Sequence, residues 1–295
     1  MVDETFWRRI KENDFQPAPE YPLDEQIAEL EHLLTYANSQ VRDGIAFEIL
    51  GEWIQTGRCD HDLPGLGDRM AAQLLRGIGE VGTDSIFGRS FAALVLGLVV
   101  ERDNAVRVLS ADDIRPWLGG FTMWWELEGD LRGSVDAERG WAHALAHGAD
   151  TIASFARSRL IGTDQARALL GSIVVRLRTT DGWGLFAGED DRLAYATMSL
   201  LHRGDLGVAD LAQAIAPLRV LGRADLRIDL DAAAFTRVNT LNWLRALYLQ
   251  LRLGVQPMPW YAPDHHFDRP IPQYERMLAE VESLLREYSS WFRED

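Results

Sequence analysis

The stretch ERGWAHALAHGAD, residues 138–150, carries the pattern that decides the fold class of this chain. His143 and His147 stand four residues apart, Asp150 follows three residues later, and alanines fill most of the gaps. Side chains three and four residues apart lie on one face of an α-helix. We therefore predict a helix over residues 136–160 with both histidines and the aspartate on one side.

The same helical period dominates the rest of the chain, and we find no convincing run of alternating strand residues. The pattern predicts an all-α fold of stacked helical hairpins, arranged as an irregular HEAT- or armadillo-like solenoid or an α/α superhelix. A lead-in over residues 1–22 precedes a single all-helical domain over residues 23–295. The other expected helices lie at 24–37, 40–56, 64–77, 83–103, 111–127, 163–177, 189–203, 207–218, 230–253 and 271–293.

Composition excludes several classes of function. A formal net charge of −15 argues against a nucleic-acid partner, because no basic face is left to neutralise phosphates. The single cysteine, Cys59, rules out an intramolecular disulfide and a multi-cysteine zinc site. The most apolar run, residues 91–100, is about half the roughly 20 residues that cross a bilayer, and no signal peptide is evident. We expect an acidic cytoplasmic protein without a membrane partner.

The predicted 136–160 helix has two faces. At 100° per residue, a polar stripe contains Asp136, Arg139, His143, His147, Asp150, Ser154 and Arg157. The opposite, packing face contains Trp141, Leu145, Gly148, Ile152 and Phe155. A solvated helix face would explain the stripe, but its flanks are alanines where an exposed helix usually carries long charged side chains. Small flanks favour a buried polar pocket or a close neighbour.

Two further segments could complete such a pocket. The turn around Glu128 and Asp130 could bring a carboxylate to the histidines. The acids that open the 189–203 helix could do the same, although acids in a first turn commonly just complement the helix dipole. The histidines of DHHF, residues 264–267, lie in a Pro-rich loop and are expected to be solvated.

Four strings of the sequence together resemble the bacterial family named domain of unknown function 2785. They are GRSFAALVLGLVVERDN (88–104), EGDLRGSVDAERGWAHALAHGAD (128–150), GEDDRLAYA (188–196) and NTLNWLRALYLQL (239–251). The resemblance covers the central part of the chain and implies an all-helical fold with no established activity. It gives weight to Arg132, Trp141, His143, His147, Asp150, Glu189, Asp190 and Arg192. Family members often have a lysine before the Gly-Trp pair, where this chain has Glu138 and Arg139.

Two functional hypotheses stay open, and whether the chain is an enzyme is one of the questions between them. In the first, a helical-repeat protein binds a peptide, a protein partner or a small ligand in a polar pocket. Its lining would be Arg132, His143, His147, Asp150, Glu189, Asp190 and Arg192. In the second, His143, His147 and Asp150 bind a divalent metal ion that activates water for hydrolysis. HALAH is not the zinc-protease motif, because Ala144 stands where that motif has glutamate.

Overall fold

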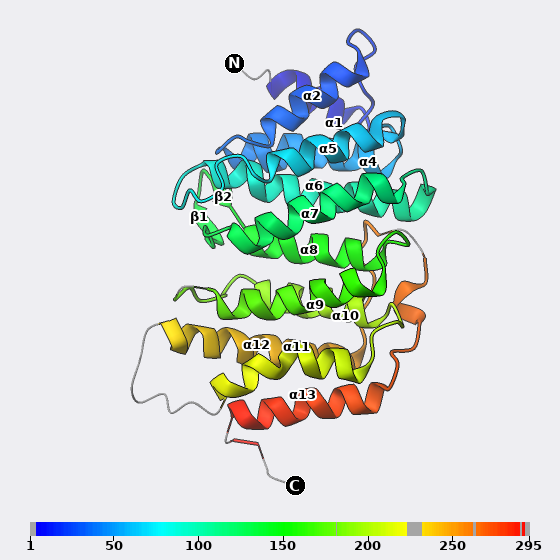
Figure 1. Ribbon diagram of the computed structural model, residues 1–295. Helices are drawn as coiled ribbons and strands as arrows, with labels where there is room; N and C mark the ends of the chain where they lie inside the picture. Colours follow the sequence, from blue (N-terminus) through cyan, green and yellow to red (C-terminus); the bar gives the residue numbers. More distant parts are fainter. Residues whose placement is uncertain (1–3, 181, 223–231, 262–263, 290, 293–295) are drawn as a thin grey trace. The chain divides into compact units, whose positions relative to one another are not determined.

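The computed structural model describes residues 4–180, 182–222, 232–261, 264–289 and 291–292, and it is mostly helical (Figure 1). This confirms the predicted all-α class. The chain divides into two compact units, Met1–Thr151 and Ile152–Asp295, and each is described by itself. The single domain over residues 23–295 stays a prediction.

The first unit consists of helices and one small hairpin. Its elements are α1 (Glu4–Glu12), α2 (Leu23–Leu33), α3 (Ser39–Val41), a π-helical turn (Arg42–Phe47), α4 (Glu48–Gln55), a 3-10 turn (Asp60–Asp62), α5 (Leu63–Gln73), α6 (Ser85–Val106), α7 (Ala111–Leu127), β1 (Ser134–Asp136) and β2 (Gly140–Trp141). Helix α8 (Ala144–Arg157) starts in this unit and ends in the second.

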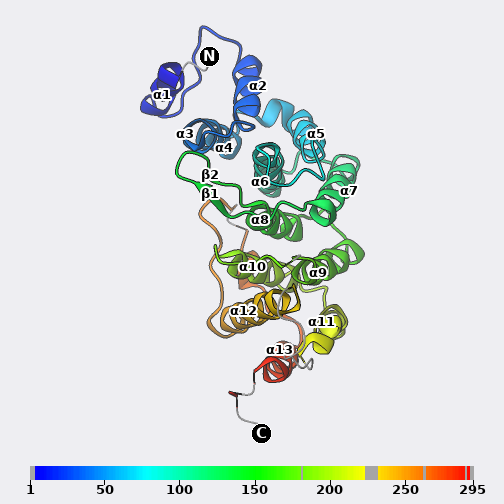
Figure 2. The same ribbon diagram turned by 90° about the vertical axis from the view of Figure 1, so that its left-hand side faces the viewer.

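Helix α6 is the core of the first unit. It is buried over most of its length, and α4 and α5 pack against it (Figure 2). Helix α7, which packs on α5, begins at a capping box. There the Asp113 side chain accepts from the Ser110 amide at 2.8 Å, and Ser110 Oγ accepts from the Asp113 amide. None of the helices in the described ranges is long and apolar enough to span a bilayer.

The lead-in helix packs onto the first unit. Trp7 and Ile10 of α1 are buried, and Trp7 Nε1 donates to Glu29 of α2 at 3.4 Å. The two apolar side chains Trp7 and Ile10 lie on one face of α1 and cover apolar surface of the first unit.

The helix predicted over residues 136–160 is wrong in its first two turns. Strands β1 and β2 pair antiparallel, with Ser134 opposite Trp141, and α8 starts only at Ala144. Asp136 Oδ1 accepts from the amides of Glu138 and Arg139 at 3.0 and 2.7 Å, which closes a turn. Gly140 follows with φ of 66°. Local turn chemistry thus outweighs the helical spacing of Asp136 and Arg139.

The second unit consists of α9 (Thr163–Arg178), α10 (Glu189–Leu201), α11 (Val208–Gly222), α12 (Ala232–Leu253), a 3-10 turn (His266–Asp268) and α13 (Tyr274–Tyr288). Helix α10 packs on α12, and α13 packs on both α11 and α12. Leu278, Val281 and Leu285 recur every three or four residues along α13 and are buried, so they form its packing face.

The DHHF loop is only half solvated, which corrects the prediction. His265 is exposed, but His266 is 2% exposed and its Nε2 lies 2.8 Å from the Ser199 carbonyl oxygen. Arg157 holds the same loop, because its guanidinium lies 3.2 Å from Asp264 and 4.0 Å from the Tyr261 ring centroid. A buried cation with an acid and an aromatic ring explains why this loop packs instead of extending into water.

The burial of His266 predicts acid sensitivity. Burial lowers the pKa of His266 to about 4, and Nε2 must carry the proton because the Ser199 carbonyl can only accept. In the unfolded state this histidine becomes protonated as the pH falls through about 6.5. The contribution of the buried neutral ring to the free energy of unfolding is therefore fully present above that pH and is lost as the pH falls toward 4. Between pH 7 and pH 5 we expect a loss of roughly 2 kcal/mol from this group.

Urea unfolding of the wild type and of His266→Gln at both pH values tests this prediction. The glutamine amide can still donate to Ser199 but does not titrate, so the difference between the two proteins isolates the histidine. Parallel pH dependence in the two proteins would contradict the prediction.

Candidate functional site

Five rings of the first unit form a row, which we call the ring row: Phe47, Phe91, His147, His143 and Trp141. Successive ring centroids lie 5.9, 5.0, 5.9 and 4.3 Å apart. The first three contacts are edge-to-face and the last is tilted, geometries that aromatic rings favour. Trp141, at one end, is 44% exposed, and Phe47, at the other, is partly exposed. Both end rings of the row are therefore at least partly accessible to solvent.

The proton position on His147 follows from its partner. His147 is 7% exposed and its Nδ1 lies 2.8 Å from Ser90 Oγ on α6. Ser90 also donates to the Ala142 carbonyl oxygen, which uses its single hydrogen. Nδ1 of His147 must therefore donate to Ser90, and the lone pair of the neutral ring sits on Nε2. The Ser90 hydroxyl is an orienting group and not a nucleophile activated by the histidine.

His143 joins the hairpin to α8 in an uncommon backbone conformation. Its φ is 51°, where few residues other than glycine are found, and such positions are frequent at functional sites. Its amide donates to the Arg132 carbonyl oxygen at 3.1 Å, and its carbonyl accepts from the His147 amide at 2.9 Å. Hairpin and helix together thus fix the ring between those of Trp141 and His147.

Trp141 does not lie on a packing face opposite the histidines, as the helical spacing predicted. It belongs to β2, its side chain is 44% exposed, and its ring lies on that of His143. The error has the same cause as the misplaced helix start. A strand residue alternates faces with its neighbours and ignores the 100° period.

Arg42 is a buried cation that contacts the ring row through Phe91. It is fully buried, and its guanidinium lies 4.1 and 4.8 Å from the ring centroids of Phe87 and Phe91. It also donates to the carbonyl oxygens of Arg139 at 2.7 Å and Trp141 at 3.4 Å, which ties β2 to the helices. Burial lowers the pKa of Arg42 and raises that of its ion-pair partner Asp43.

Arg42, Asp43 and Phe47 all come from the π-helical turn Arg42–Phe47. Turns of this kind are rare and occur frequently at functional sites, because the extra residue redirects side chains. Here the turn directs a buried cation and a partly exposed ring toward the same row.

The acids of the 128–130 turn bind arginines. Glu128, 1% exposed, accepts from Arg89 at 2.6 and 3.1 Å and from Trp124 Nε1 at 3.0 Å. Asp130 accepts from Arg132 and from the Gly82 amide at 2.9 Å. The predicted constrained turn is present. Its contacts fix Arg132 and the segment before α6, so its carboxylates build the scaffold of the site.

The predicted pocket residues fall in both units. Arg132, His143, His147 and Asp150 lie in the first unit, and Asp150 is 9% exposed, so a fully solvated polar face is wrong. Glu189, Asp190 and Arg192 open α10 in the second unit. Glu189 accepts from the Ala187 amide at 2.8 Å, and burial raises its pKa. Whether these acids close a pocket over the histidines stays a prediction.

The metal alternative has no support in the donor arrangement. Within the described ranges, no group of three or more His, Cys, Asp or Glu side chains is placed to hold a metal ion. The proposed set of His143, His147 and Asp150 as metal ligands therefore stays a prediction from the sequence.

Arg42, Ser90 and Phe91 also belong to the site, although the sequence did not single them out. Ser90 and Phe91 stand within GRSFAALV, where the apolar run indicated only packing. A signal was nevertheless present, because Arg89 and Ser90 stand side by side directly before that run, and a buried helix rarely carries two polar residues without partners. Arg42 lies far away in the sequence, and nothing in its neighbourhood pointed to the histidines.

The comparisons with known proteins give one match. A family model described as "Protein of unknown function (DUF2785)" matches residues 74–249, which is more than half of the chain and confirms the predicted resemblance. No curated protein and no solved structure matches the chain. The match includes α6, the hairpin and the histidines, whereas Arg42 and Phe47 precede it.

Proposed function

The chain belongs to the DUF2785 family of proteins of unknown function, and from this premise we propose that it is a binding protein whose ring row receives a cationic group. The group would be an amine or guanidinium carried by a small ligand or a peptide. The observation that carries the proposal is Trp141, a half-exposed tryptophan whose ring lies tilted against that of His143 at the end of an ordered row of rings.

Rings of this kind suit a cation. A tryptophan face attracts ammonium and guanidinium groups, with an energy of about 0.5–2 kcal/mol depending on desolvation. Arg42 already makes the same contact inside the protein, against Phe87 and Phe91. Trp141 offers the ligand an exposed version of that contact.

The charges around the row favour a cation over an anion. Arg42, Arg89 and Arg132 are each paired with an acid. Exposed Arg139 is shared between Asp136 and Asp84. Glu138, in the turn between β1 and β2, adds a negative charge next to Arg139, and the whole chain carries a formal net charge of −15. A positively charged ligand is therefore attracted and an anion repelled.

Three finer predictions join this proposal. We propose that the helices stack as an irregular solenoid or α/α superhelix, that the protein works in the cytoplasm of a bacterium, and that its partner is a peptide, a protein or a small ligand. The helical hairpin pattern of the sequence supports the first, and its composition supports the second.

Fluorine NMR of protein labelled with fluorotryptophan tests the binding proposal. Trp141→Phe assigns the resonance of Trp141. Titration with tetramethylammonium and with N-acetylarginine amide should shift this resonance to saturation, and N-acetylglutamate amide should not. His143→Ala, which removes the ring beneath Trp141, should weaken binding roughly tenfold, as expected for a loss of about 1.4 kcal/mol.

Trp183 provides a matched control, because it is also 44% exposed but lies in the second unit. Its resonance should not respond to the cationic probes. Equal shifts of Trp141 and Trp183, or equal responses to the cationic and anionic amides, would overturn the proposal.

A further inference from the structure

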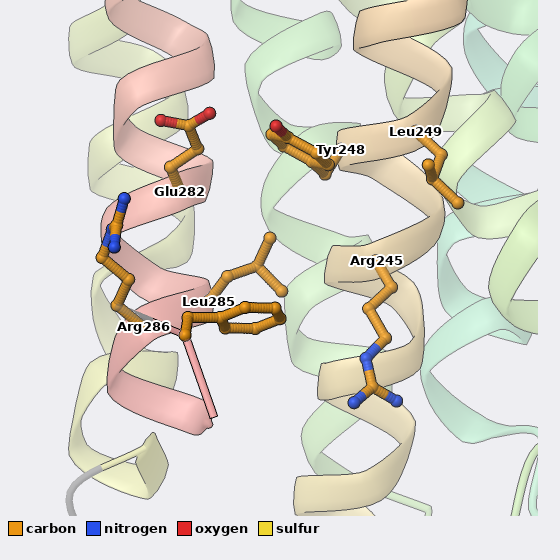
Figure 3. A pocket seen from close by; sticks show the side chains of 7 residues that line it. Arg245, Tyr248, Leu249, Glu282, Leu285 and Arg286 are labelled. Carbon is orange, nitrogen blue, oxygen red and sulfur yellow. The ribbon is translucent and has the colours of Figure 1, made fainter. Parts of the chain in front are cut away.

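A pocket of about 430 Å³ lies between α12 and α13 in the second unit, far along the chain from the ring row (Figure 3). Its lining consists of Arg245, Tyr248, Leu249, Glu282, Leu285, Arg286 and Phe292. The volume falls within the range of small-molecule sites, which is about 300–1,000 Å³.

The floor of this pocket is apolar and partly open to solvent. The side chain of Leu285 lies between the two helices, and Leu249 borders the pocket from α12 (Figure 3). Phe292 also lines the pocket. Leu249 is 53% and Phe292 44% exposed. Apolar surface gathered in a concave site gains free energy when an apolar ligand covers it, at roughly 25 cal/mol per Å².

Two arginines flank the floor, with Arg245 on α12 and Arg286 on α13 (Figure 3). Arg245 is exposed, and it forms no ion pair within the described part of the chain. A guanidinium fork matches the geometry of a carboxylate. Glu282 also lines the pocket, four residues before Arg286 on α13, so Arg245 is the cation that attracts a negatively charged ligand to this apolar surface.

We infer that this pocket binds a single-chain amphiphile with a carboxylate head. The chain of the ligand covers Leu249, Leu285 and Phe292, and the carboxylate is bound by Arg245. A peptide helix fits less well as the ligand. Such a helix is bound through apolar anchors spaced over several turns, and the apolar floor of this pocket is too short for them. The inference is independent of the ring row and of the cationic ligand proposed there.

Isothermal titration calorimetry with decanoate below its micellar concentration tests the inference. We expect one molecule to bind per chain. Octanoate should bind more weakly by roughly fourfold for each methylene removed, which is the effect of about 0.8 kcal/mol per buried CH₂. Decyltrimethylammonium, which has the same chain and the opposite charge, should bind at least tenfold more weakly than decanoate.

Surface substitutions locate the site without threatening the fold. Leu249→Asp places an anion on the floor and should abolish decanoate binding. Arg245→Gln should weaken binding of decanoate about tenfold and leave decyltrimethylammonium no weaker than before. Arg276→Gln is the matched control, since it removes an exposed arginine of α13 that does not line the pocket, and it should leave binding unchanged.

Three results would overturn the inference. The first is equal affinity for decanoate and decyltrimethylammonium, and the second is decanoate binding that survives Leu249→Asp. The third is a wild-type dimer in light scattering that Leu249→Asp converts to monomer, because a second copy of the chain would then be the occupant.

Discussion

Replacing Arg89 with methionine is expected to lower the free energy of unfolding by about 3–5 kcal/mol. Arg89 is fully buried and pairs with Glu128, which is 1% exposed. Its guanidinium also donates to the Gly77 carbonyl oxygen and to Ser85 Oγ, both at 2.8 Å. Methionine fills similar space but leaves the Glu128 carboxylate buried without its counter-ion, and that uncompensated charge accounts for most of the cost.

The double variant Arg89→Met with Glu128→Gln separates charge from packing. Glutamine removes the buried charge and can still accept from Trp124 Nε1 through its carbonyl oxygen, a bond of 3.0 Å in the wild type. We expect the double variant to be more stable than Arg89→Met alone when both are unfolded in urea. If its loss equals the sum of the two single losses, the buried pair does not act as a unit and the prediction is wrong.

The helices of this fold were predictable because their signal is local. Leu278, Val281 and Leu285 of α13 recur every three or four residues and form one buried face, whereas the continuous apolar run of α6 is typical of a helix buried on most sides. The hairpin was not predictable by the same means. Its strands span three and two residues, too few for a period to appear, and the turn depends on Asp136 and on Gly140 at positive φ.

The candidate site, like the fold, was predictable from the sequence only in part. His143 and His147 could be selected from the sequence, since four-residue spacing brought their rings together even with His143 just outside the helix. The partners of these rings could not. Ser90 precedes His147 by 57 residues, and Arg42 reaches Trp141 over 99. Contacts at such separation depend on helix packing, which a single sequence does not specify.

Arg42→Met is expected to destabilise the first unit by about 2–4 kcal/mol and to loosen the hairpin, since buried carbonyl oxygens lose their donors. Arg42 bonds carbonyl oxygens of two separate segments, Ala37 at 2.9 Å before the π-helical turn and Arg139 at 2.7 Å in the hairpin. Its ion pair with Asp43, at 2.7 Å, would also be lost. Methionine retains apolar contact with Phe87 and Phe91 but supplies no donors, so the buried carbonyls lose their partners.

Hydrogen exchange separates the local effect from the global one. The Ala142 amide donates to Gly133 at 2.8 Å, and the His143 amide donates to Arg132, so both report on the hairpin. In Arg42→Met we expect their protection to fall by more than that of the α6 amides. Arg139→Gln is the control, since it breaks only exposed ion pairs worth about 0–1 kcal/mol and leaves the Arg139 carbonyl in place. Equal losses of protection in the hairpin and in α6 would contradict this prediction. Arg42 would then stabilise the whole unit and would not position Trp141. In that case the cationic probes should bind Arg42→Met as they bind the wild type.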